Sequence, residues 1–74
     1  MTFLIRPRAP LYQARALETW RDAELLVQQR WDTFRKAHGA ARRGAFAAYL
    51  AALDAEAAAA GDLADVSDDL AEAA

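Results

Sequence analysis

The chain has 74 residues, which is room for one domain. It contains no cysteine, which excludes a core held by disulfides, and only one histidine, which argues against a structural zinc site. Hydrophobic residues make up 55% of the chain, but 21 of them are alanine and 20 are larger, so the predicted core is thin and self-association is expected. All nine basic residues and four acidic ones lie in residues 1–43, while residues 44–74 hold seven acidic and no basic residues, a two-ended layout that favours charge-directed association.

Residues 1–10 are predicted to form an extended N-terminal arm. Pro7 and Pro10 each disfavour the helical conformation of the residue before them, and Pro10 also suits the first turn of a following helix. The apolar run at residues 3–5, followed by Arg6 and Arg8, could bind a partner or add a strand to the edge of a sheet. Folding back over the chain's own helices, or swapping between two copies, is the favoured interpretation. That run is too short for an export signal, and we expect a cytoplasmic protein.

A long helix is predicted from about Leu11 to Ala37. Apolar side chains and one histidine recur there at intervals of three and four, which places on one stripe Tyr12, Ala16, Trp20, Ala23, Val27, Trp31, Phe34 and His38. Trp20 and Trp31 are interpreted as core residues on this stripe, and stacking of bases or a flat ligand is the alternative. Leu11 and Leu25 lie away from the stripe and predict a second contact face, as in an oligomer.

The helix is expected to end at a tight turn at His38 and Gly39, followed by a basic stretch. Glycine there suits a left-handed C-cap, and the basic residues before it favour the end of the helix dipole. Arg42 and Arg43 follow in the first turn of the next helix, where the dipole disfavours cations, so capping does not account for them. The stretch is interpreted first as the charged turn of a helical hairpin with solvated cations. Contact with phosphate, or with the acidic end of the same or a neighbouring chain, is the alternative for Arg35, Lys36, Arg42 and Arg43.

A second helix is predicted from about Ala40 to Ala60, closed by Gly61. It has an apolar stripe of Phe46, Leu50, Leu53 and Ala57 and is rich in alanine, which favours the helix and allows a neighbouring backbone to come close. Its apolar stretch contains Asp54 and Glu56 and is shorter than the roughly 20 residues that a membrane span needs, so no membrane association is expected.

Residues 62–74 form an acidic tail, predicted to be disordered or a short helix. The tail carries five acidic residues, with Leu63, Val66 and Leu70 at helical spacing. Such a segment could fold on a basic, grooved partner, or could be a solubilising end.

No residue pattern supports catalysis, a metal site or a cofactor. Ser67 lies in the acidic tail, and the threonines have no histidine at a suggestive spacing. The Glu-x-x-His motif of helical di-iron sites does not occur in the sequence. The protein is therefore expected not to be an enzyme.

The sequence as a whole predicts an all-α fold: a hairpin of two antiparallel helices over residues 11–61, with the arm and the tail, pairing into a dimeric four-helix bundle. The predicted core or oligomer interface consists of Trp20, Val27, Trp31, Phe34, Phe46, Leu50 and Leu53. The leading functional hypothesis is a non-enzymatic adaptor or regulator that self-associates and binds another protein through its tail or arm. The alternatives are a nucleic-acid-associated factor that uses the basic turn, and a structural subunit of a larger assembly.

Overall fold

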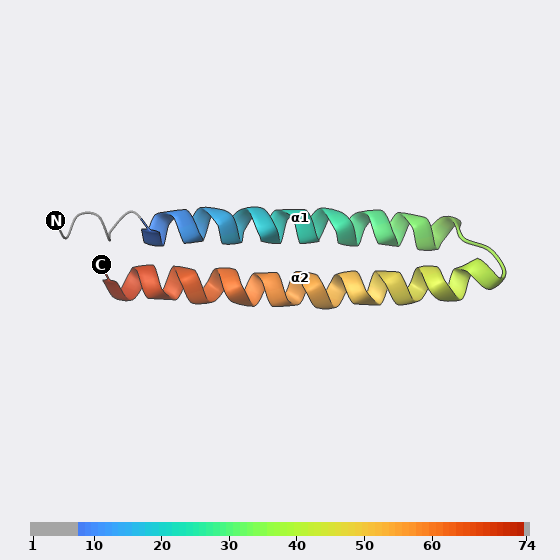
Figure 1. Cartoon of the computed structure of the whole chain (residues 1–74). Coiled ribbons are helices and arrows are strands. Elements are labelled where there is room, and N and C mark those ends of the chain that lie inside the picture. Colours follow the sequence, from blue (N-terminus) through green and yellow to red (C-terminus); the bar gives the residue numbers. More distant parts are fainter. Residues whose placement is uncertain (1–7, 74) are drawn as a thin grey trace.

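The computed structural model describes the backbone of residues 8–73 and the side chains of residues 10–72. Over this part the chain consists of two helices, α1 (Arg8–Lys36) and α2 (Ala40–Ala73), which lie antiparallel and side by side along their whole length (Figure 1). The all-α hairpin predicted from the sequence is confirmed. The predicted contacts of residues 1–7 lie outside the described residues.

Helix α1 begins at Arg8, three residues before the predicted start, and so includes the last residues assigned to the arm. Pro10 stands in the first turn of the helix rather than ahead of it. The first four N–H groups of a helix have no partner within the helix, so proline costs little at this position.

The turn between the helices is built on Gly39, as predicted. Gly39 has a φ of 58°, the left-handed conformation that glycine adopts without steric cost, and it is the one residue with positive φ between residues 8 and 73. On either side of it, the amide of Ala37 donates to the carbonyl of Phe34 at 3.2 Å and the amide of Arg42 donates to the carbonyl of Gly39 at 3.1 Å. The chain thus reverses direction between Lys36 and Ala40.

Replacing Gly39 by alanine is expected to lower the free energy of unfolding by about 1 kcal/mol, because a left-handed conformation strains any residue with a Cβ. No atom lies within 4 Å of a Cβ built at Gly39, so the strain would come from the backbone alone. Gly61→Ala is the matched control. Its site is helical and equally open, and the variant should raise the stability by roughly 0.5–1 kcal/mol. Urea unfolding measures both changes, and equal effects of the two variants would contradict the C-cap assignment.

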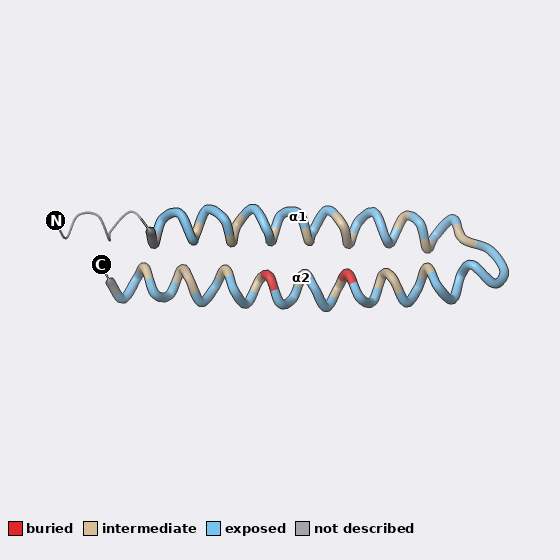
Figure 2. The backbone as a smooth tube through the Cα atoms, viewed as in Figure 1, coloured by how far each residue is buried: buried red, intermediate tan, exposed pale blue. Residues whose placement is uncertain are grey.

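Helix α2 continues through Gly61 to Ala73, so the prediction that Gly61 closes the second helix is wrong. Glycine in a helix interior costs only about 1 kcal/mol relative to alanine. The residues beyond it supply a compensating contact, because Leu63, Val66 and Leu70 are half-buried. Figure 2 shows that the half-buried stretches of this end of α2 lie on the side that faces α1. Packing on α1 thus explains why a glycine that could end a helix does not end this one.

The two helices meet along rows that repeat every three and four residues, and we call these rows the seam. A mean spacing of 3.5 residues is that of a coiled coil. On α1 the seam consists of Gln13, Ala16, Trp20, Ala23, Val27 and Phe34, and Ala37 continues it just beyond the end of the helix; the position between Val27 and Phe34 is occupied by the exposed Arg30. On α2 the seam consists of Ala45, Tyr49, Ala52, Glu56, Ala59, Leu63, Val66 and Leu70. Apart from Arg30, all of these residues are buried or half-buried.

The predicted stripe on α1 coincides with the seam in the middle of the helix and departs from it at both ends. Tyr12, Trp31 and His38 are exposed, while the neighbouring Gln13 and Ala37 are half-buried. Successive residues of the predicted stripe are on average more than 3.5 residues apart, whereas those of a coiled-coil seam are 3.5 apart. The stripe therefore moves gradually around the helix, away from the seam.

The hairpin encloses very little core. Among the residues whose side chains the structure describes, only Ala52 and Ala59 are buried, at 4% and 6% exposure. Large apolar side chains stay exposed on both helices, namely Leu11, Tyr12, Leu25, Trp31, Phe46 and Leu50. Within residues 8–73, neither helix has a stretch long and apolar enough to cross a membrane.

Candidate interaction surface

Two polar contacts cross the seam between side chains far apart in the sequence. The indole N–H of Trp20 donates to Oε2 of Glu56 at 2.7 Å, and Nε2 of Gln13 donates to Oγ of Ser67 at 3.2 Å. A polar pair is satisfied in only one alignment of two helices, so these contacts specify the register. Sequence reasoning did not identify Gln13 or Glu56. Their positions in the 3.5-residue rows were the available signal.

Four aromatic rings form a cluster beside the turn. Trp31 and Phe46 each contact both Phe34 and Tyr49, with ring centroids between 5.2 and 6.5 Å apart and the planes tilted, which is the usual range for favourable aromatic pairs. Phe34 and Tyr49 are half-buried in the seam, whereas Trp31 and Phe46 remain 44% exposed. The cluster fastens the turn end of the hairpin and leaves two large rings partly uncovered.

A second apolar row runs along α2 immediately beside the seam, and we call it the flank. It follows the same alternation of three and four residues, one position later than the seam, through Phe46, Leu50, Leu53, Ala57, Ala60, Ala64, Ser67 and Ala71. Phe46 and Leu50 are each 44% exposed, and Leu53 is half-buried. The sequence-predicted stripe of the second helix is the first half of this flank. It lies at the edge of the hairpin contact rather than at its centre.

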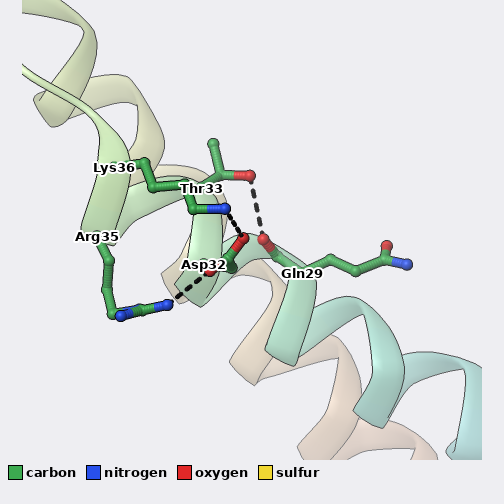
Figure 3. A network of polar contacts seen from close by, with 5 residues as sticks. All are labelled: Gln29, Asp32, Thr33, Arg35 and Lys36. Atoms are coloured by element: carbon green, nitrogen blue, oxygen red, sulfur yellow. Dashed lines mark hydrogen bonds and ion pairs between the residues drawn. The ribbon is translucent and has the colours of Figure 1, made fainter.

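At the end of α1, the basic residues are engaged by a neighbouring carboxylate. Asp32 accepts a hydrogen bond from Nη2 of Arg35 at 2.7 Å and forms an ion pair with Nζ of Lys36 at 2.8 Å (Figure 3). The hydroxyl of Thr33, on the same turns of helix, donates to the carbonyl of Gln29 at 3.0 Å. Arg35 and Lys36 are thus partnered within α1, as expected for cations in a last turn.

Arg42 does cap α1, contrary to the expectation that capping does not account for it. Its Nη1 donates to the carbonyl of Ala37 at 3.4 Å, and its guanidinium carbon lies 4.2 Å from the centre of the Phe34 ring. The side chain reaches back across the turn, so it meets the negative end of the α1 dipole despite its place at the start of α2. Arg43 and His38 are exposed and have no polar partner within the described part of the chain.

The ion pairs of Asp32 predict a pH dependence. Hydrogen bonds from Lys36 first, and from Arg35 second, lower the pKa of the Asp32 carboxyl below its ordinary value of 3.8. The pairs therefore stabilise the fold above that value and are lost as the pH falls through the lowered pKa. In an NMR titration, Asp32 should titrate below pH 3.8. Lys36→Gln should return the midpoint toward 3.8 more strongly than Arg35→Gln. A wild-type midpoint at or above 3.8 would refute the pairing.

The predicted partner-binding residues of the acidic segment turn inward. Leu63, Val66 and Leu70 belong to the seam and are half-buried, whereas the acidic side chains around them are exposed: Asp62, Asp65, Asp68, Asp69 and Glu72. What this end of α2 presents to solvent is therefore mainly negative charge. Its apolar residues stabilise the hairpin.

Other sequence-predicted residues are not brought together. Leu11 and Leu25 are exposed at 65% and 54% on the outer side of α1, two heptads apart. That spacing places them about 21 Å from each other along the helix.

The two tryptophans are also separate. Trp20 lies in the seam and Trp31 belongs to the aromatic cluster, so the two indoles form no common stacking surface. Among the described residues, no group of three or more acidic, histidine or cysteine side chains could hold a metal ion.

Comparison with protein-family models, curated proteins and solved structures finds no match to this chain. The functional conclusion therefore depends on the surfaces described above.

Proposed function

We propose that the chain is a small non-enzymatic interaction protein: a helical hairpin that self-associates through its uncovered apolar residues and binds a basic protein partner with the acidic surface of α2. One observation carries the first part of this proposal. No described side chain larger than alanine is buried, so a single hairpin removes too little apolar surface from water to be stable alone. Another polypeptide must complete the core.

The second part rests on the exposed charge at the C-terminal end of α2. Because the larger apolar residues of this segment pack inward, its exposed side chains are acidic apart from two alanines: Asp62, Asp65, Asp68, Asp69 and Glu72. A dense negative surface on a rigid helix attracts a basic partner and discriminates against acidic ones.

The nucleic-acid alternative has less support. Three of the four basic side chains near the turn already have partners within the hairpin, and the chain carries a net charge of −2. A structural subunit that grows head to tail is the other alternative. It predicts a mass that rises without limit as the protein is concentrated.

The dependence of stability on protein concentration tests self-association. If folding requires a second chain, the urea midpoint of the wild-type protein should rise as the protein concentration is raised, because mass action favours the associated state. A cooperative transition whose midpoint is the same over a hundredfold range of concentration would contradict the proposal.

Charge-neutral variants test the acidic surface. Affinity purification with the wild-type chain should recover a basic protein in stoichiometric amount, and Asp65→Asn with Asp69→Asn should reduce its recovery severalfold. The matched control removes two exposed carboxylates from α1, by Glu18→Gln with Asp22→Asn, and should leave recovery unchanged. An equal loss with both pairs would show that the acidic surface of α2 has no specific role.

A further inference from the structure

We propose that the surface covered on self-association is the flank of α2 and that its occupant is a second copy of this chain, lying antiparallel so that the turn end of one hairpin covers the open end of the other. This inference rests on the self-association proposed above. It adds the face, the direction and the residues that meet.

The sizes of the flank residues favour the antiparallel direction. The half near the turn is bulky, with Phe46, Leu50 and Leu53, and the half near the open end contains only small side chains: Ala57, Ala60, Ala64, Ser67 and Ala71. If two copies pack in opposite directions about Ala57, the bulky half of each meets the small half of the other. Packed in the same direction, bulky residues would oppose each other and the small residues would leave a gap, which close-packed interfaces avoid.

The exposure of these residues agrees with an interface at this place. Phe46 and Leu50 are 44% exposed, as is Trp31, which joins Phe46 in the aromatic cluster at the edge of the flank. The large apolar side chains that the hairpin leaves uncovered near the turn therefore border one side of the molecule. By contrast, the exposed Leu25 lies on the outer side of α1, about 21 Å along the helix from the exposed Leu11.

The charges favour the same direction. The half of the hairpin next to the turn, residues 23–53, holds five basic and two acidic residues, whereas residues 8–22 and 54–73 hold three basic and nine acidic ones. Antiparallel packing brings opposite charges together at both ends of the dimer, and parallel packing brings like charges together. Arg43 continues the flank row toward the turn and has no partner within the described hairpin. In the antiparallel dimer it lies opposite Asp68 and Glu72 of the second copy.

Single cysteines test the direction, because the natural chain contains none. In the antiparallel dimer, residue 57 of each copy lies near the symmetry axis, so the Ala57→Cys variant should form a disulfide-linked dimer under mild oxidation. The Ala71→Cys variant should not, because the two copies of residue 71 would be about 40 Å apart and a disulfide needs Cα atoms within about 7 Å. Ala58→Cys, on the outer side of α2, is the matched control and should stay unlinked.

Two further variants test the face and the charges. Light scattering should give the wild-type protein twice the 8.1 kDa mass of one chain. Leu50→Glu should give 8.1 kDa, and Leu25→Glu, at a similarly exposed apolar site on α1, should remain a dimer. Arg43→Glu should raise the dissociation constant about three- to tenfold, in keeping with an exposed ion pair. Adding Glu72→Arg to the Arg43→Glu chain should return the dissociation constant to the wild-type value.

The outcomes separate this inference from the proposed function. Rapid cross-linking of Ala71→Cys in a dimeric protein would overturn the antiparallel direction and leave self-association intact. A dimer that Leu25→Glu dissociates and Leu50→Glu does not would move the interface to α1 and overturn the assignment of the flank. A wild-type protein of 8.1 kDa at all concentrations would overturn this inference and the proposed self-association together.

Discussion

Replacing either buried alanine of the seam by leucine is expected to destabilise the protein by about 1–3 kcal/mol, one of the two largest effects among the single substitutions considered. Ala52 and Ala59 are 4% and 6% exposed, and they lie where α2 faces α1, so a larger side chain there must push the helices apart. The total stability of a domain this short is on the order of 4–11 kcal/mol, so the loss is a large fraction of it. Urea unfolding at fixed protein concentration measures the change.

The chain offers close controls for these substitutions. Ala51→Leu and Ala58→Leu introduce the same side chain one residue earlier, on exposed positions of the same helix. Substitutions at such positions usually change the stability by less than about 0.5 kcal/mol. If the exposed variants lost as much stability as Ala52→Leu and Ala59→Leu, the seam described here would be in the wrong register.

Replacing Trp20 by alanine is expected to have the other large effect, a loss of about 3 kcal/mol. The substitution removes the largest side chain of the seam on α1 and leaves the carboxylate of Glu56 without the hydrogen bond that Trp20 donates at 2.7 Å. The value lies at the low end for a tryptophan because this side chain is only half-buried. Urea unfolding followed by circular dichroism measures the loss.

A second substitution at the same site separates the two contributions. Trp20→Phe keeps an aromatic ring in the seam and removes the N–H donor, so it should cost only the hydrogen bond to a charged acceptor, roughly 1.5 kcal/mol. Combining Trp20→Phe with Glu56→Ala should then cost less than the sum of the single changes, since both act on one contact. Strict additivity would contradict a direct bond between the two side chains.

Gly39 and Gly61 show when a glycine in the sequence predicts the end of a helix, because α1 ends just before Gly39 and α2 continues through Gly61. At Gly39, basic residues and the end of the apolar row coincide with the glycine, and the structure has a left-handed turn there. At Gly61 only the glycine was present, and the row of Leu63, Val66 and Leu70 ran on beyond it. A helix end is predicted reliably when several effects agree, because glycine alone costs about 1 kcal/mol and packing can offset it.

The basic turn shows a similar limit. The pairing of Asp32 with Lys36 follows from a spacing of four residues on one helix, which the sequence displays. The contact of Arg42 with the carbonyl of Ala37 and the ring of Phe34 depends on how the chain folds back at the turn. The dipole of α2 alone predicts that a cation at Arg42 is disfavoured. That prediction leaves out the end of α1, which the turn brings within reach of the Arg42 side chain, and so it was wrong about capping.

By itself, the sequence determined the helical hairpin, the place of the turn, the thinness of the core and the opposite charges of the two halves, because these follow from composition, local propensity and spacing along one chain. Only the tertiary structure decided which of the apolar rows became the seam and which remained uncovered, and that Glu56 and Gln13 lie at the helix contact. The physical reason is that the small side chains of the alanine-rich α2 allow α1 to approach it in several registers of similar apolar content. The register is selected by contacts between residues more than thirty positions apart.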